Sequence, residues 1–238
     1  MLDTPINLLV YLAVWRRPEI TELCFMGIDR MRKHPLYNIE ALAVISEPEM
    51  IPLCNKYNVK WFMADNYPLG KKKNKGLKEA SNFKFDYLIE IGSDDLITND
   101  LLDCYFPYFN KFDFFGISDA AYIESENLSC RRHTFNKSTY GAGRCMSRKM
   151  LEDMGWNIWD DNLQRGLDNN STMRIGTKGY KFNKIPPMDV PGLIDIKSQE
   201  NLWKFNYFIG EEYDINLLFA KLSDSEKNKI ISLAYVGT

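Results

Sequence analysis

Two neighbouring carboxylates, Asp94 and Asp95, have the chemical type and the spacing to hold a divalent metal ion. They come directly after Gly92 and Ser93, at the end of the apolar run of residues 87–91. Glycine allows the backbone to approach a ligand closely, and paired carboxylates suit Mg²⁺ or Mn²⁺ beside a diphosphate. The alternative is an ordinary turn with a helix cap, because Ser and Asp favour both.

A run of lysines and glycines at residues 69–77 is the concentrated basic segment of the sequence. Because a helix is predicted to begin at Asn74, helix-start amides and ammonium groups, that of Lys72 among them, could meet a phosphate or a nucleotide. The alternative is a solvated surface loop, which is the usual place of a lysine run.

The elements around these residues predict an α/β fold. Strands are predicted at 6–14, 39–45, 59–63 and 87–91, with helices between them at 18–33, 48–57 and 74–82. This alternation is typical of βαβ units and of a mostly parallel sheet. Open α/β sheets bind their ligands at the carboxyl ends of the strands, and Asp94 and Asp95 lie at such an end.

The second half of the chain has a less regular pattern. It predicts strands at 112–117 and 120–123, helices at 147–154 and 168–175, and a helical tail from residue 211. In the tail, Ser223 and Glu226 have capping-box spacing before an apolar run.

Composition excludes several classes of protein. Lys and Arg number 30 against 32 Asp and Glu, so no global field favours nucleic acid or an anionic membrane. The apolar run of residues 6–15 is about half the length of a transmembrane helix. Five widely spaced cysteines and two histidines disfavour disulfides and a zinc site. We therefore expect a cytoplasmic protein whose metal site, if it has one, is built from oxygen ligands.

Four segments, taken in order, resemble glycosyltransferase family 2 and its GT-A fold. They are the turn VWRRP at 14–18, Ser46-Glu47, the KxNxGLxxA pattern at 72–80, and DYLIEIGSDD at 86–95. The resemblance is close over residues 6–100 and loose beyond. It implies a Rossmann-like, mostly parallel sheet flanked by helices in one domain. That domain would comprise a nucleotide-binding half (1–100), an acceptor-side half (101–210) and a helical tail (211–238).

The resemblance also implies roles for residues on the donor side. Trp15, Arg16 and Glu47 would hold the nucleoside of a nucleotide-sugar. Lys72, Asn74 and Ser93 would lie along the rest of the donor, and Asp94 with Asp95 would bind the metal. These donor-side residues are matched by position in the family motifs. The family's usual first aspartate corresponds to Gly92 here, so another group must complete the metal shell.

Further along, the resemblance implies an acceptor side and a catalytic base. Gly143 and Arg144 lie in a glycine-rich stretch that would line the acceptor side together with Trp156, although aromatics are more often core than sugar platforms. Asp168, at a predicted helix start, would be the general base of an inverting transfer. Its alternative role is to cap that helix through Asn169 and Ser171.

A C-terminal segment would return to the metal or the phosphates, with Asp195 as a metal ligand and Lys197 as a donor-binding residue. The histidine usual in the family at this place is missing, because neither histidine lies beyond residue 133. Asn201 or Trp203 would belong to a lid.

Together these features predict a glycosyltransferase that uses Mn²⁺ or Mg²⁺ to move a sugar from a nucleotide-sugar, UDP-linked by resemblance, to an acceptor hydroxyl. One alternative is a sugar-phosphate nucleotidyltransferase, although the first strand is followed by residues 15–18 rather than a glycine-rich loop. Another is a non-catalytic nucleotide-sugar-binding protein. The acceptor stays open among glycan, protein, lipid-linked sugar and, given the basic residues 131–133, a modified nucleic-acid base.

Overall fold

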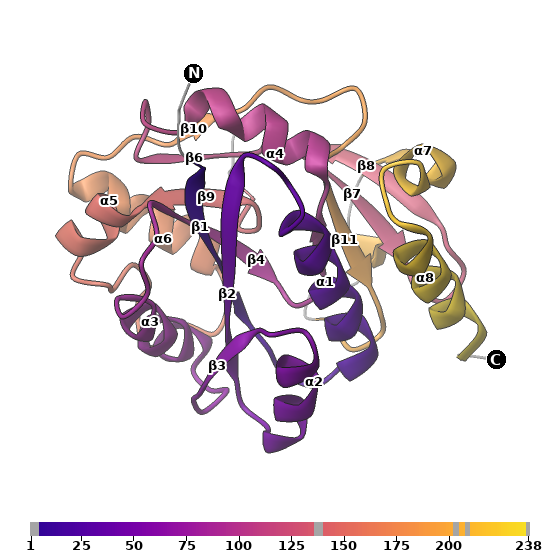
Figure 1. Cartoon of the computed structure of the whole chain (residues 1–238), viewed down its shortest axis with the longest axis horizontal. Coiled ribbons are helices and arrows are strands. Elements are labelled where there is room, and N and C mark those ends of the chain that lie inside the picture. The colour runs from indigo at the N-terminus through magenta and orange to yellow at the C-terminus, as the bar shows by residue number, and fades with distance from the viewer. Residues whose placement is uncertain (1–4, 136–139, 202–204, 208–209, 237–238) are drawn as a thin grey trace.

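The computed structural model describes the chain except for residues 1–4, 136–139, 202–204, 208–209 and 237–238. Its elements surround two β-sheets (Figure 1). Within this described part, none of the helices combines the length and the apolar character needed to cross a membrane.

The first sheet has seven strands. Its strands, in spatial order, are β10 (Asn183–Lys184), β6 (Phe114–Gly116), β9 (Arg144–Ser147), β4 (Tyr87–Gly92), β1 (Ile6–Ala13), β2 (Tyr37–Ile45) and β3 (Lys60–Met63). The four strands β4, β1, β2 and β3 run parallel, and β9 is antiparallel to both of its neighbours. The predicted mostly parallel sheet is confirmed, and the carboxyl ends of β1, β2 and β4 meet at one edge.

Helices pack on both faces of this sheet. One apolar core joins the sheet to α1 (Pro18–Met31), α2 (Ile51–Lys56) and α4 (Asn99–Tyr105). A second core joins the other face to α3 (Leu69–Ala80), α5 (Arg148–Asp153) and α6 (Leu167–Thr177). The β1 pattern explains this arrangement, because alternate side chains of a buried strand point to opposite faces and nearly all of them here are apolar.

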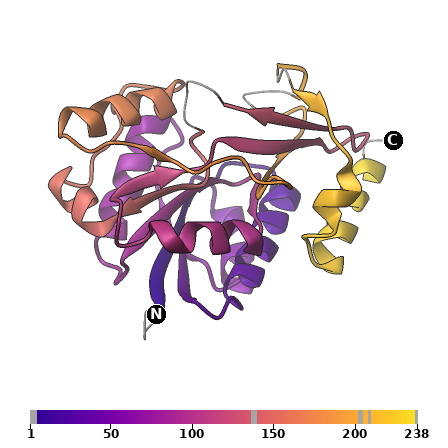
Figure 2. The same cartoon turned by 90° about the horizontal axis from the view of Figure 1, so that it is seen from above.

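A second sheet of five strands was not predicted from the sequence. Its order is β12 (Glu211–Glu212), β8 (Cys130–Thr134), β7 (Asp119–Glu124), β11 (Leu193–Lys197) and β5 (Asp95–Ile97). Its apolar side chains form a third core with α1, α7 (Ile215–Phe219) and α8 (Asp224–Val236). In Figure 2 the C-terminal helices, drawn in yellow, lie beside this sheet. Because β5 follows β4 almost directly, the two sheets meet at the carboxyl end of β4.

Helix α3 begins earlier in the chain than predicted. It begins at Leu69 rather than at Asn74, so the lysine run lies inside the helix and not in a loop. Its buried residues recur at helical spacing and include Lys72 and Asn74. The glycines that suggest a loop serve packing instead, since a Cβ on Gly76 would lie 2.0 Å from Val44 Cγ2.

The remaining differences concern short elements. The predicted helix at 48–57 is a 3₁₀ turn, η1 (Pro48–Met50), followed by α2. The predicted helical tail begins with β12, and helices follow only from Ile215. The capping box is confirmed, because Ser223 N donates to Glu226 Oε2 at 2.8 Å and Glu226 N donates to Ser223 Oγ at 3.3 Å.

Candidate active site

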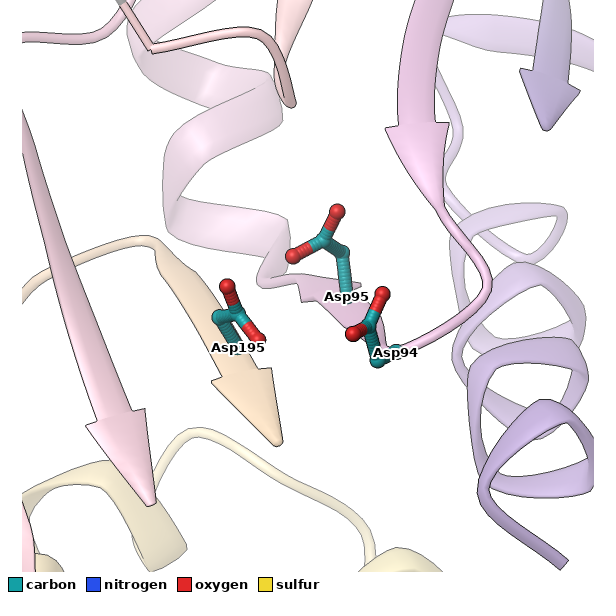
Figure 3. A group of neighbouring side chains, drawn as sticks. All are labelled: Asp94, Asp95 and Asp195. Carbon is teal, nitrogen blue, oxygen red and sulfur yellow. The ribbon is translucent and has the colours of Figure 1, made fainter. Parts of the chain in front are cut away.

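Three carboxylates converge where the two sheets meet. Asp95 in β5 lies directly opposite Asp195 in the antiparallel β11, and a cross-strand pair of this kind places both side chains on the same face. Asp94 precedes β5, and its carbonyl accepts a hydrogen bond from Ile196 N at 2.8 Å. One carboxylate oxygen of each aspartate lies within 4.8 Å of the others, and the side chains point toward one another (Figure 3).

Gly92 is required by this arrangement. Its amide donates to Asp95 Oδ2 at 2.5 Å, which orients that carboxylate. A Cβ at this position would lie 2.6 Å from Asp94 Oδ1 and 2.7 Å from Asp95 Oδ2. Gly92, which stands where the related motif has an aspartate, therefore makes room for two carboxylates, while Asp195 brings a third from a distant strand.

The electrostatics of the cluster are unequal. Although burial opposes it, Arg17 and Lys197 hold the pKa of Asp94 below its ordinary value. Burial and repulsion from Asp195 and Asp94 raise the pKa of Asp95 well above its ordinary value. Burial also raises the pKa of Asp195, against the attraction of Lys197, whose Nζ lies 2.6 Å from Asp195 Oδ2. Additional positive charge near Asp95 and Asp195 would relieve this repulsion.

The residues present fit a divalent metal ion. Asp95 Oδ1 and Asp195 Oδ1 are buried without a hydrogen-bond partner among the described residues, a costly state for a carboxylate oxygen. The donors of this cluster are all carboxylate oxygens, which Mg²⁺ and Mn²⁺ prefer over softer metals. Asp94, Asp95 and Asp195 are thus the residues that could hold such an ion.

Arg17, which the sequence analysis did not single out, lies against this cluster. Its Nη1 donates to Asp94 Oδ2 at 3.1 Å and to Asn201 Oδ1 at 2.8 Å, and its Nη2 donates to Ser93 Oγ at 3.2 Å. Asn201 in turn donates to Asp94 Oδ2 at 2.5 Å, so the segment after β11 is tied to the cluster. Trp203, the other predicted lid residue, lies outside the described residues.

A cavity of about 610 Å³ opens beside the carboxylates, which is within the usual range for small-molecule sites. The end of β4, helix α3, residues 140–142 and the start of α6 enclose it. Several predicted site residues line it: Trp15, Lys72, Ser93, Asp94, Asp95, Asp168, Asp195 and Lys197. The structure therefore brings donor-side, metal and catalytic candidates from across the sequence to one cavity.

Asp168 lies on the side of the cavity formed by α6. It is the second residue of that helix, whose N-cap is Gly166 without a side-chain cap, so the capping alternative finds no support. Its carboxylate lies close to Gly141, where a Cβ would be 2.2 Å from Asp168 Oδ1. Arg144 Nη2 donates to the Asp168 carbonyl at 3.0 Å and thereby steadies the helix start.

A buried ion pair in the cavity wall was also missed. Lys73 Nζ donates to Glu90 Oε1 and lies 4.3 Å from the centre of the Trp159 ring. Glu90 Oε2 has no partner among the described residues. A lone glutamate inside the apolar strand at 87–91 was the available signal, because a charge in a buried strand requires a partner.

Lys72 lies in the cavity floor rather than on the surface. Its Nζ donates to Val14 O at 2.5 Å and to Asn66 Oδ1 at 3.0 Å. Burial lowers the pKa of Lys72 to about 8, although Glu47 opposes this shift. The ammonium group thus joins the end of β1 to the segment before α3.

The predicted nucleoside residues gather at the end of β1. Glu47 Oε2 accepts a hydrogen bond from Arg16 N at 3.2 Å, which connects the turns after β1 and β2. The Arg16 guanidinium lies 4.4 Å from the centre of the Trp15 ring, and Trp15 is 36% exposed at the cavity. An exposed aromatic ring at this position offers a face for stacking.

Six predicted residues are not among those that line the cavity. Arg16 and Glu47 lie in the turns after β1 and β2, and the other four lie in the framework around the cavity. Asn74 lies inside α3, on its buried face, because this helix begins at Leu69 rather than at Asn74. Its side-chain amide therefore bonds the backbone of Ile158 and Trp159. Gly143 and Arg144 lie behind the cavity wall, where Arg144 bonds Tyr140 O and Ser171 Oγ. Trp156 packs edge-on against Phe85 in the second core. Tyr140, Gly141 and Ala142 line the cavity in their place.

Many solved structures resemble the chain, among them the following two. The mannosyltransferase PcManGT from Pyrobaculum calidifontis, in complex with GDP-Man and Mn²⁺, has a TM-score of 0.55 and 12% identity, with 82% of this chain and 57% of that chain covered. S. aureus TarS (residues 1–349) has a TM-score of 0.54 and 13% identity, with 97% and 71% covered. The match thus spans little more than half of the mannosyltransferase's length. No protein-family model matches the sequence, and no curated protein matches it. These likenesses confirm the predicted fold.

Removal of one cluster carboxylate should weaken metal binding. We expect Asp94→Asn or Asp195→Asn to lower the affinity for Mn²⁺ by at least about 10-fold, since ligand charge sets the affinity of such sites. Isothermal titration calorimetry with Mn²⁺ alone measures this. Asp224→Asn, a change at an exposed helix-start carboxylate of α8, should leave the affinity unchanged. Equal affinities in all variants would remove these aspartates from the metal site.

Burial of Lys72 predicts a pH-dependent stability. Because its pKa falls from 10.5 to about 8 on folding, the unfolded chain holds more protons between those values, and the free energy of unfolding rises with pH there. Relative to Lys72→Met, the wild type should gain about 2 kcal/mol between about pH 7.5 and about pH 9.5 in urea denaturation. Lys75→Met, on the exposed face of α3, should show no such gain. If the free energies of unfolding of wild type and Lys72→Met change with pH in parallel, folding does not lower the pKa of Lys72.

Proposed function

We propose that the chain is a metal-dependent glycosyltransferase that takes a sugar from a nucleotide-sugar. The observation that carries the proposal is the carboxylate cluster, two oxygens of which have no partner within the residues that the structure describes. The cluster opens onto a cavity lined by Arg17, Lys72 and Lys197. A metal ion held by the carboxylates, together with these cationic side chains, suits a diphosphate, because its negatively charged oxygens bind metal ions and cationic groups. The fold shared with a mannosyltransferase solved with GDP-Man and Mn²⁺ supports the same ligand class.

On the donor side, Asp94, Asp95 and Asp195 would hold the metal ion, Mn²⁺ or Mg²⁺. The bound ion would supply neutralisation of the negative charge that develops on the leaving diphosphate. Trp15, which lines the cavity, would stack on the base. Glu47, which does not line the cavity but is held against the turn after β1, would take a ribose hydroxyl of a donor that extends to this turn. Ser93 and Lys197, which line the same cavity, would contact the phosphates.

On the acceptor side, Asp168 would act as the general base. The acceptor oxygen attacks the anomeric carbon as its proton passes to the Asp168 carboxylate, and the bond from that carbon to the diphosphate oxygen breaks with its electron pair on the diphosphate. A single displacement of this kind inverts the configuration. Among the described residues, the carboxylate of Asp168 has no hydrogen-bond partner that would hold it from an incoming hydroxyl.

The proposed donor is UDP-linked, on the resemblance of the sequence motifs, while the GDP-Man of the mannosyltransferase makes GDP-sugars the first competitor. The acceptor class stays open. A cytoplasmic location is part of the proposal and is supported by five cysteines that form no disulfide.

A panel of UDP- and GDP-sugars tests the proposal. Each is added with and without Mn²⁺, first in a thermal-shift assay, because a ligand of the folded state raises the melting temperature. We expect one nucleotide family to stabilise the protein only with metal, and slow donor hydrolysis to release nucleoside diphosphate. Release of pyrophosphate from a nucleoside triphosphate would instead indicate a nucleotidyltransferase, and binding without turnover a non-catalytic protein.

Asp168→Asn should separate binding from transfer. Because it removes the base but keeps the shape, we expect donor binding to persist while sugar transfer or donor hydrolysis falls by about 100-fold or more. Gly141→Ala, whose Cβ would displace the same carboxylate, should also reduce turnover. Asp224→Asn serves as the control, and full activity of Asp168→Asn would exclude the base role.

A further inference from the structure

We infer that Arg17 is a counter-cation shared between the metal site and the diphosphate: it competes with the metal ion for Asp94 and adds to the binding of a nucleoside diphosphate. The inference rests on the proposed function for its second half. Its first half concerns the metal site alone and can be tested without any nucleotide.

The contacts of Arg17 place a full positive charge on a proposed metal ligand. Its Nη1 lies 3.1 Å from Asp94 Oδ2, and both side chains are 16% exposed, so water screens the pair only weakly. A divalent ion that binds Asp94 must therefore share this carboxylate with the guanidinium, or replace it.

The backbone supports a dedicated role for this side chain. Arg16 and Arg17 both adopt left-handed conformations, with φ of 55° and 54°. Such conformations are uncommon for residues other than glycine, and two in succession are costly. This conformation lets the short turn between β1 and Pro18 reach Ser93 and Asp94 at the end of β4. Strain of this kind persists where the surrounding contacts hold it in place.

The guanidinium retains donors for a ligand. Asp94 and Asn201 take the two hydrogens of Nη1, and Ser93 takes one of Nη2. The second Nη2 hydrogen and the Nε hydrogen have no partner within the described part of the chain. Arg17 lines the cavity, and two adjacent N–H groups of a guanidinium match the oxygens of a phosphate.

The two roles make opposite predictions for one substitution. Without the guanidinium, Asp94 is free for the metal and a repelling charge is removed, so Mn²⁺ alone should bind more tightly. The diphosphate loses a charged donor, so it should bind more weakly. A purely structural tie from the turn after β1 to β4 would instead weaken both, because its loss would loosen the whole site.

Calorimetry of Arg17→Gln tests the inference. We expect Mn²⁺ alone to bind at least about 5-fold more tightly than to the wild type, since a unit charge a few ångströms away is removed. At saturating Mn²⁺, UDP and GDP are the probes, and whichever the wild type binds should bind the variant about 10-fold or more weakly, as loss of a charged hydrogen bond implies. Arg17→Lys keeps the charge without the planar guanidinium, so its affinities for Mn²⁺ and for the nucleotide should lie between those of the wild type and those of Arg17→Gln.

Lys75→Gln removes an equal charge from the exposed face of α3 and should change neither affinity. The inference is overturned if Arg17→Gln keeps the wild-type melting temperature and binds Mn²⁺ no more tightly than the wild type does. If Arg17→Gln fails to fold, the same comparison is made with Arg17→Lys. If the wild type binds neither UDP nor GDP with Mn²⁺, the proposed function fails and the diphosphate half fails with it. The result with Mn²⁺ alone still decides the metal half.

Discussion

Repulsion among Asp94, Asp95 and Asp195 is the constraint around which the rest of the site is arranged. Two of these carboxylates are buried in neighbouring antiparallel strands, and one oxygen of each has no partner in the described part of the chain. Arg17, from the turn after β1, and Lys197, from the same strand as Asp195, compensate part of the negative charge. A divalent cation would neutralise the remaining negative charge, and its binding would therefore stabilise the junction of the two sheets.

The junction of the two sheets is what allows such a cluster to form. The first sheet ends β4 at Gly92, and the chain passes within three residues into β5 of the second sheet. The absence of a side chain at Gly92 leaves space for the Asp94 and Asp95 carboxylates, and its amide fixes one of them. A substitution here would move both ligands at once, which explains why a glycine can stand where the related motif has an aspartate.

Several polar residues that a motif comparison assigns to ligands serve the framework instead. Asn74 binds the backbone at 158–159, and Arg144 braces the start of α6 and residue Tyr140. Through Arg144 the position of the Asp168 carboxylate depends on a buried cation behind it. Hydrogen bonds therefore connect the framework to the site, and a substitution of Arg144 should change the position of groups that line the cavity.

The sequence by itself determined the α/β alternation, and Asp94 and Asp95 as candidates at a strand end, because these follow from local periodicity and neighbouring residues. Asp168 became a candidate base only through the family resemblance. The division into one domain with two halves and a tail stays a prediction. Arg17, Glu90 with Lys73, and the second sheet were not foreseen, and Asp195 entered only by resemblance. Its pairing with Asp95 joins residues 100 positions apart in an antiparallel register. Such contacts depend on how separate elements pack, which no local pattern encodes, so only the tertiary structure decided which charges face one another.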